Sequence, residues 1–226
     1  FFMLLSTELN AFRAEFMEKV PAEIRDAMTK ADLALAAGGI TERALKAGAT
    51  APDFILPDVH GNKVKLSTLL AKGPVVLSFY RGGWCPYCNL ELRALQQVLP
   101  QLKQLGATLV AISPQTPDES LSTSEKNALS FPVLSDQAST VASSFGITFD
   151  LADELRPIYT AFNHALPQKN GVDSWVLPIP ATYVIAKTGK ILLSFVDVDY
   201  RNRLEPAAVI TVLSAEQKAS TEGEQA

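Results

Sequence analysis

The sequence predicts an α/β protein in which helices cover both faces of a mixed central sheet. Its 226 residues are 47% hydrophobic, enough to bury a full core. From Ala49 onward, short apolar runs typical of strands alternate with stretches of helical periodicity, which favours a layered α/β sandwich. A late β-hairpin and a last helix follow the strand–helix–strand order, so we expect a mixed sheet.

The chain divides into three parts: an N-terminal helical extension at residues 1–45, a main domain at residues 46–215 and a polar C-terminal tail at residues 216–226. In the extension, apolar residues recur at helical spacing on both sides of Pro21, which predicts two helices. Phe12 and Phe16 form an aromatic stripe on the first of them. We expect the protein's own core to cover this stripe; the alternative is that it packs on a second copy in a homodimer.

The main domain is predicted to begin with a hairpin and to continue with alternating strands and helices. We expect a turn at residues 60–62, strands near 75–80, 107–113 and 131–136, helices near 86–105, 116–129 and 137–147, an irregular stretch at 150–175, a hairpin over 181–197 and a closing helix over 204–217. Pro100 should kink the first of these helices, and Gly106 should end it. The tail that follows should fray.

The net charge and the composition of the first ten residues argue against nucleic-acid binding and membrane insertion. The net charge is −4, with both signs interspersed, so a nucleic acid is a poor partner for this chain. Residues 1–10 contain only five consecutive apolar residues without a preceding basic stretch, too few for a signal peptide or a membrane span. We therefore expect a cytoplasmic protein with no membrane partner.

Both cysteines of the chain, Cys85 and Cys88, lie in the stretch "WCPYC", where a buried strand gives way to a helix. Pro86 is favoured at the first helical position, which places Cys85 at the helix N-terminus. Unpaired backbone N–H groups and the positive end of the helix dipole favour a thiolate there. We expect Cys85, at the exposed end, to attack, and Cys88, shielded one turn deeper, to resolve the intermediate as a disulfide.

The residues before the pair support this chemistry. Trp84 should form an apolar wall beside the attacking sulfur, and Arg81 adds a nearby positive charge. Gly82 and Gly83 allow a tight turn and the close approach of a substrate. The cation that stabilises the thiolate could instead come from later loops, and three arginines there are candidates: Arg156, Arg201 and Arg203.

Other roles for the cysteines are less favoured. A structural zinc site needs four ligands, and the chain offers only the two cysteines, His60 and His164, without a second close pair, so no metal is expected. A structural disulfide would close a very short loop in a reducing compartment. Two inert buried cysteines remain the general alternative. His60 is expected in a solvated turn, whereas His164 could line the active site.

At these motifs the chain resembles the thioredoxin-like superfamily and, within it, the peroxiredoxin-like branch of the alkyl hydroperoxide reductase/thiol-specific antioxidant family. The resemblance covers about residues 46–215. It rests on "KAGATAPDFILPDVHGNKVKLSTL" at the opening, on "GPVVLSFYRGGWCPYC" leading into the cysteines, and on "LPIPATYVIAKTGKI" at the later strand pair. It implies a thioredoxin-like three-layer α/β/α sandwich and a redox activity that needs no cofactor.

The resemblance also implies a role for Pro180. In such folds the proline before the later strand is a cis-proline that faces the active-site cysteines, so we expect a cis bond before Pro180. The chain departs from the peroxiredoxin motif Pro-x-x-x-Thr/Ser-x-x-Cys, because Gly82 stands at the Thr position and Ser78 at the Pro position. The "WCPYC" stretch is closer to thioredoxin and glutaredoxin, in which the pair exchanges disulfides.

Three functions follow from these features. The first is a thiol peroxidase: Cys85 reduces hydrogen peroxide or an organic hydroperoxide, becomes a sulfenic acid, condenses with Cys88 and is recycled by a thioredoxin-like reductant. The second is a thiol-disulfide oxidoreductase that uses the same pair on disulfide substrates. The third is a non-enzymatic redox sensor. We favour the peroxidase, because the longer family architecture supports it.

Overall fold

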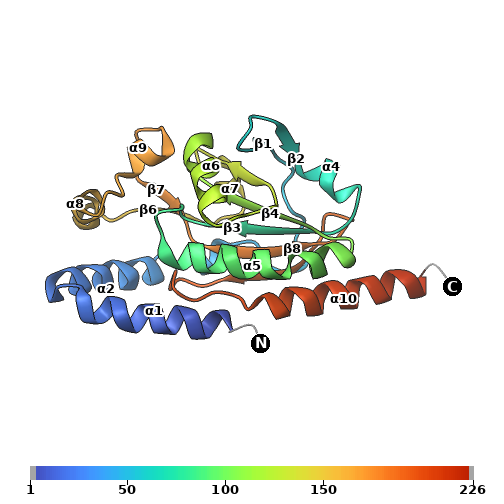
Figure 1. The fold of residues 1–226 in the computed structure, drawn as a ribbon, viewed down its shortest axis with the longest axis horizontal. Helices are drawn as coiled ribbons and strands as arrows, with labels where there is room; N and C mark the ends of the chain where they lie inside the picture. The colour runs from blue at the N-terminus through green and yellow to red at the C-terminus, as the bar shows by residue number, and fades with distance from the viewer. Residues whose placement is uncertain (1–3, 224–226) are drawn as a thin grey trace.

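A five-stranded mixed sheet forms the centre of the molecule, whose computed structural model describes residues 4–223 (Figure 1). The strands lie in the order β5-β4-β3-β8-β9. β4 pairs in parallel with both β3 and β5, whereas β8 pairs antiparallel with both β3 and β9. Their bounds are β3 (Val75–Phe79), β4 (Thr108–Ser113), β5 (Val133–Ser135), β8 (Ala181–Ile185) and β9 (Ile191–Val196). The predicted mixed sheet and late hairpin are confirmed.

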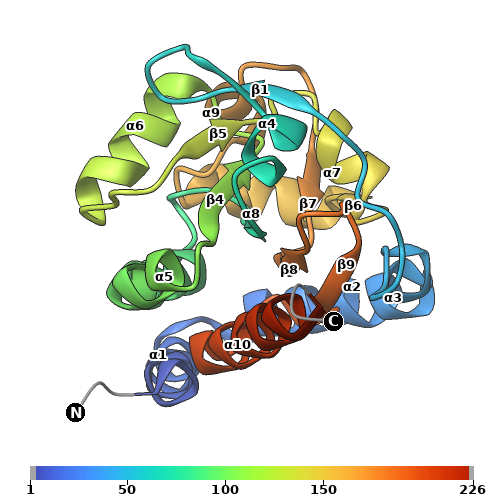
Figure 2. The same ribbon diagram turned by 90° about the vertical axis from the view of Figure 1, so that its right-hand side faces the viewer.

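Helices cover both faces of this sheet because its central strands are apolar on both sides. Side chains alternate along a strand, so Val76 faces one layer while Leu77 faces the other. The first layer contains α5 (Pro86–Gln104) and α10 (Pro206–Gly223), and the second contains α4 (Leu66–Leu70) and α7 (Thr140–Ser144) (Figure 2). The predicted three-layer α/β/α sandwich is therefore confirmed.

Smaller elements surround the sandwich. The predicted opening hairpin is formed by β1 (Ile55–Pro57) and β2 (Lys63–Lys65), and α6 (Pro117–Lys126) packs on β5. The stretch that we expected to be irregular lies between the paired strands β6 (Thr148–Asp150) and β7 (Val176–Pro178). It holds three short helices: η1 (Asp153–Leu155), α8 (Arg156–Ala161) and α9 (Leu166–Asn170).

The N-terminal extension forms the two predicted helices, α1 (Leu5–Lys19) and α2 (Ala22–Ala37), followed by the short α3 (Ile40–Arg43). Figure 1 shows α1 running alongside α5 on the outside of the first layer, with α10 farther along the same side of the molecule. Leu5 and Leu9 are buried in one core with residues of α5 and α10. Phe12 packs edge-on against Tyr87 of α5, with ring centroids 5.1 Å apart. The protein's own core thus covers Phe12, as expected.

One boundary differs from the sequence prediction. The tail expected to fray from residue 216 instead continues α10 as far as Gly223, because good helix formers such as Lys218 and Ala219 follow without a stop signal. The last part of that prediction, residues 224–226, lies outside the described residues. Across residues 4–223, no helix combines the length and hydropathy that crossing a bilayer requires.

Candidate active site

Cys85 caps the N-terminus of α5, and Pro86 occupies the first turn, as the sequence predicted. The sulfur therefore lies where unpaired helix N–H groups and the helix dipole favour a negative charge. The expected exposure is wrong: Cys85 is only 1% exposed and Cys88 is fully buried. Side chains of α1, α2 and the segment after α8 cover the attacking sulfur, a long-range arrangement that local sequence does not reveal. Both cysteines are free thiols.

Two glycines and two polar side chains hold the loop before Cys85. The Gly83 N–H donates to Gln115 Oε1 at 2.8 Å, and Asn89 Nδ2 donates to the Gly83 carbonyl at 2.8 Å. A Cβ at Gly83 would collide with the Thr123 side chain, so this position needs glycine. Gly82 has a φ of 152°, and a Cβ there would meet the indole of the neighbouring tryptophan. The loop is thus fixed tightly before the reactive thiol.

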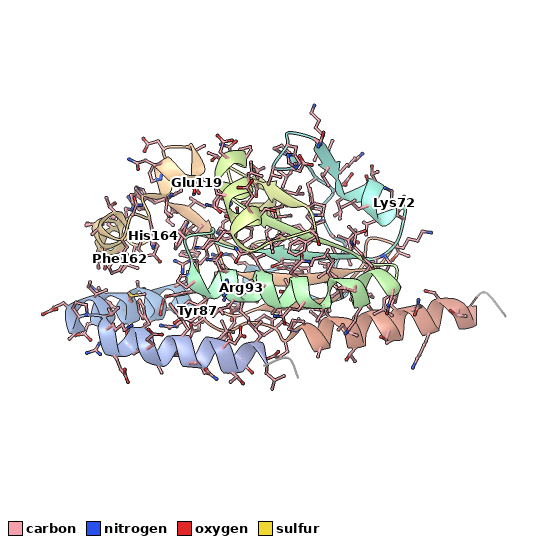
Figure 3. All side chains as sticks on the ribbon, in the orientation of Figure 1. Lys72, Tyr87, Arg93, Glu119, Phe162 and His164 are labelled. Atoms are coloured by element: carbon pink, nitrogen blue, oxygen red, sulfur yellow. The ribbon has the colours of Figure 1, made fainter. Side chains whose placement is uncertain are left out.

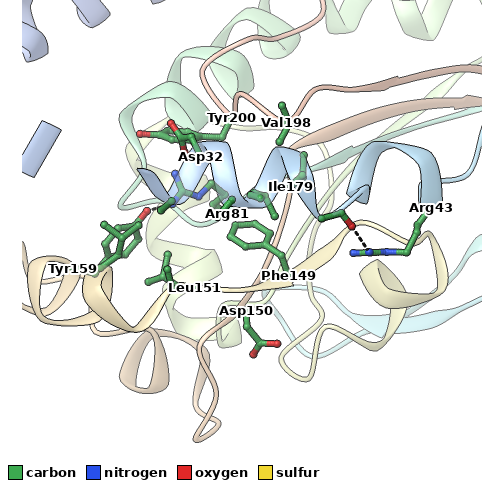
Figure 4. Close-up of a pocket in the computed structure, with 16 residues that line it drawn as sticks. Asp32, Arg43, Arg81, Phe149, Asp150, Leu151, Tyr159, Ile179, Val198 and Tyr200 are labelled. Carbon is green, nitrogen blue, oxygen red and sulfur yellow. Dashed lines mark hydrogen bonds between the residues drawn. The ribbon is translucent and has the colours of Figure 1, made fainter. Parts of the chain in front are cut away.

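Arg81 is a buried cation surrounded by aromatic rings. Its guanidinium carbon lies 5.0 Å from the ring centroid of Trp84, 5.6 Å from that of Tyr159 and 4.2 Å from that of Tyr200. It also donates a hydrogen bond to the Tyr159 hydroxyl, and Figure 4 shows it between Tyr159 and Tyr200. No carboxylate of residues 4–223 forms an ion pair with it. Its charge remains available to a nearby thiolate.

The two thiols differ in acidity. Burial raises the pKa of Cys85, but a hydrogen bond from Cys88 and the positive charges of Arg81 and Arg203 outweigh burial and lower the pKa to about 6. Burial and the neighbouring Cys85 raise the pKa of Cys88. Near neutral pH, a thiolate therefore forms more readily at Cys85 than at Cys88.

A buried ion pair reaches Cys88 from the far end of the chain. Arg203 Nη2 lies 3.4 Å from Cys88 Sγ, and Arg203 Nε donates to Glu91 Oε2 at 2.6 Å. Both side chains are buried, and Thr182 Oγ1 donates to the other carboxylate oxygen of Glu91 at 3.3 Å. Because the buried carboxylate offsets part of its charge, Arg203 can approach both sulfurs without being an isolated buried cation.

The structure separates the candidate arginines. Arg81 and Arg203 act on the thiols, whereas Arg201 pairs with Asp32 and Asp199, and Arg156 pairs with Asp153. Sequence reasoning named these four arginines without choosing among them. It missed the partners Glu91, Tyr159, Tyr200 and Thr182, because only the fold brings them to the cysteines.

The expected cis bond before Pro180 is wrong. Pro180 is buried between β7 and β8, and no cis peptide bond occurs in the described part of the chain. The backbone N–H of Ile179 donates to the carbonyl of Ile147 at 2.7 Å, which extends the pairing of β6 and β7. The bond before Pro180 is therefore trans.

The two histidines lie in different surroundings. His60 is exposed in the predicted turn, and His164 stacks on Trp84 with centroids 4.9 Å apart. Figure 3 shows His164 and Phe162 near the end of the molecule where α8 lies. Burial lowers the pKa of His164, which favours its neutral form. Within residues 4–223, His, Cys, Asp and Glu form no cluster of three that could hold a metal ion.

A small cavity of about 80 Å³ opens in front of Cys85. Its walls are mainly aromatic and apolar, and they come from α1, α2, α8 and the cysteine loop. Four of the lining residues carry a buried polar atom without a hydrogen-bond partner in the described chain: Arg81 Nε, Trp84 Nε1, Tyr87 Oη and His164 Nδ1. Buried polar groups are normally paired, so four unpaired groups among the residues around one thiol single out this region of the molecule.

Comparison with known proteins agrees with this geometry. The family model described as "AhpC/TSA family" matches residues 47–194. A Mycobacterium tuberculosis protein named "Putative peroxiredoxin MT1643" is 35% identical over 114 residues, which cover 50% of this chain and 74% of that protein. The thiol-disulfide oxidoreductase ResA of Geobacillus kaustophilus is 32% identical over 149 residues, which cover 66% of this chain and 68% of ResA.

Solved structures give the same fold. The crystal structure of peroxidoxin BcpB from Mycobacterium tuberculosis superposes with a TM-score of 0.60 and 27% identity, covering 76% of this chain and 97% of BcpB. The reduced 2-Cys peroxiredoxin of Plasmodium vivax has a TM-score of 0.61 at 17% identity, covering 79% of this chain and 86% of that chain, which shows the fold alone. With the family model matching most of the chain, this protein belongs to the AhpC/TSA family, within the thioredoxin-like superfamily.

Proposed function

We propose that this protein is a thiol peroxidase in which Cys85 reduces a hydroperoxide and Cys88 resolves the product. One observation carries the proposal: Cys85 caps α5 with a pKa lowered to about 6 and lies on a cavity whose lining residues hold unpaired polar atoms. The family and the similarity to peroxiredoxins support it further.

The proposed reaction has three steps. The Cys85 thiolate attacks the terminal oxygen of the hydroperoxide, the O–O bond breaks, and the leaving alkoxide or hydroxide takes a proton from water. The Cys88 thiol then attacks the Cys85 sulfenic acid, which forms the disulfide and releases water. Finally, a dithiol of the thioredoxin type reduces the disulfide to two thiols and is itself oxidised. No metal or organic cofactor takes part.

Named residues would assist each step. The positive charge of Arg81 stabilises the thiolate, and its unpaired Nε–H can donate to a peroxide oxygen, a role that the missing motif threonine would otherwise fill. Arg203 beside Cys88 Sγ lowers the cost of forming a thiolate there for the resolving step. Trp84 excludes water from the sulfur. Pro180 is buried before β8, and we propose for it only a supporting structural role.

We also propose that residues 46–215 are the catalytic domain, to which residues 1–45 are an extension. The family match over residues 47–194 supports the start of this domain. A reduced cysteine pair that depends on a dithiol suits the cytoplasm, where we propose that the protein acts. A homodimer remains a prediction.

The test is the rate at which the reduced protein consumes peroxide, followed in a stopped-flow instrument by the fluorescence of Trp84. We expect a rate far above that of a free thiol, and we expect Cys85→Ser to abolish it. Cys88→Ser should still react once, but it should stop as the Cys85 sulfenic acid, which dimedone labelling and mass spectrometry detect. A Cys85→Ser variant that still turns over would exclude the proposed nucleophile.

A thiol-disulfide oxidoreductase is the second candidate, favoured by the Cys-x-x-Cys spacing and the identity with ResA. It predicts a peroxide rate like that of free cysteine together with rapid disulfide exchange with thioredoxin. The same stopped-flow experiment, repeated with oxidised thioredoxin in place of peroxide, separates the two functions.

A further inference from the structure

The N-terminal extension forms part of the wall around the reactive thiol. Phe12 and Phe16 of α1 and Met28 of α2 line the cavity in front of Cys85. The rest of the lining comes from the main domain: Arg81, Trp84, Pro86, Tyr87, Ile158, Tyr159, Phe162, His164 and Tyr200. The three extension residues lie outside residues 47–194, the part that the family model matches. This part of the wall is thus encoded outside the stretch that the family model matches.

Specific contacts hold the extension in this position. The backbone N–H groups of Leu5 and Ser6 donate to the carboxylate of Glu205 at 3.2 and 2.7 Å, which ties the first turn of α1 to the start of α10. Asp32 of α2 pairs with Arg201 at 2.8 Å. Because both helices are anchored on the main domain, their apolar side chains are a fixed part of the cavity.

We propose that this wall selects the substrate: Phe12, Phe16 and Met28 favour hydroperoxides that carry a compact apolar group over hydrogen peroxide. The proposal rests on the peroxidase function proposed above. A tert-butyl group loses water-exposed apolar surface when it enters the cavity, whereas hydrogen peroxide has no such surface to bury. The wall therefore stabilises only the organic substrate.

The size of the cavity limits the group. An apolar cavity of about 150 Å³ admits benzene. The cavity before Cys85 has about half that volume, roughly 80 Å³. A branched group of about four carbons suits this space, whereas the phenyl-bearing group of cumene hydroperoxide would extend out through its open side. The structure thus predicts that tert-butyl hydroperoxide reacts faster than hydrogen peroxide.

The experiment compares single-turnover rate constants of Cys85 oxidation for these three peroxides in the full-length protein. The test variants are Phe16→Ala and Met28→Ala, and the matched control is Met17→Ala, a neighbouring α1 side chain that is 40% exposed and does not line the cavity. In the test variants, the ratio of the tert-butyl to the hydrogen peroxide rate constant should fall about three- to tenfold. Cumene hydroperoxide, whose ring can extend through the open side of the cavity, is measured for comparison. Met17→Ala should not change the ratio.

Two results would overturn the proposal while leaving the peroxidase intact: a wild-type protein that reacts fastest with hydrogen peroxide, or ratios that do not change in either test variant. If no peroxide reacts faster than with a free thiol, the peroxidase function fails instead. The wall is then tested by whether tert-butyl alcohol protects Cys85 from iodoacetamide. Protection that is lost in Phe16→Ala supports the wall, and absence of protection in the wild type rejects it.

Discussion

Replacing Arg81 by Met should shift the pH at which Cys85 becomes reactive. With a pKa of about 6 instead of the ordinary 9.0, Cys85 is roughly 90% thiolate at pH 7, against about 1% for an ordinary thiol. Reactivity should therefore rise as the pH passes about 6 and level off above it. Removing one nearby positive charge should move this midpoint upward by about 1 to 3 pH units.

The midpoint is a sharper readout than the rate. The fraction of thiolate at pH 7 rises about 90-fold when the pKa falls from 9.0 to about 6. A thiolate of lower pKa is also a weaker nucleophile, and with a Brønsted slope of about 0.4 to 0.5 its rate constant falls roughly 20-fold. The net advantage at pH 7 is only several-fold, so a rate at a single pH says little about Arg81. The full profile separates ionisation from intrinsic reactivity.

The assay is alkylation of Cys85 by iodoacetamide from about pH 4 to pH 10, with the labelled cysteine identified by mass spectrometry. Arg156→Met is the matched control, because this arginine stacks on Trp175 and pairs with Asp153 away from the cysteines. Arg81→Lys keeps a positive charge and should restore part of the shift. A midpoint that is the same in Arg81→Met, Arg156→Met and the wild type would refute the electrostatic role of Arg81.

Three further variants test the neighbouring contacts. Arg203→Met leaves the Glu91 carboxylate buried without its ion-pair partner, so it should lower the free energy of unfolding in urea by about 3 to 5 kcal/mol. The double variant Arg203→Met/Glu91→Gln removes the buried charge as well and should recover much of this loss. Gly83→Ala should cost about 1 to 3 kcal/mol, and Thr123→Ala in the same chain should relieve it, because the added Cβ meets the Thr123 side chain. Tyr87→Phe removes a buried hydroxyl that has no partner in the described chain; it should slow peroxide reduction about tenfold and leave the free energy of unfolding unchanged or slightly raised.

Each of these has a contrary result. If both Arg203 variants unfold like the wild type, the buried ion pair is not a stabilising unit. Additive costs for Gly83→Ala and Thr123→Ala would show that the two sites do not collide. An unchanged peroxide rate in Tyr87→Phe would remove its hydroxyl from substrate binding.

The sequence predicted those features that depend on neighbouring residues. The helix start at Cys85 follows from Pro86 directly after it, because capping preferences act within one turn. The buried strand β3 follows from a continuous apolar run after Gly73 and Pro74. The sheet type, the two extension helices and the late hairpin likewise follow from local patterns.

Contacts between residues that are far apart in the sequence could not be predicted from local patterns. Arg203 and Glu91 are 112 positions apart, and nothing in either local stretch indicates a buried pair. The exposure of Cys85 was predicted wrongly because helices far away in sequence cover it. The cis bond before Pro180 was expected from the family resemblance alone, and no local pattern in this sequence specifies the isomer of that bond.

The anchoring of α1 and α2 over the thiol has a consequence for how this protein can diversify. The reactive cysteines and the three extension residues of the apolar wall are encoded in separate stretches of the chain, which meet where α1 packs on α5 and where Asp32 of α2 pairs with Arg201. Mutations in the extension can therefore change the choice of oxidant while the reactive loop stays the same. Related proteins that keep the same cysteine loop but differ in these two helices would then prefer different peroxides, although the thiol is activated in the same way.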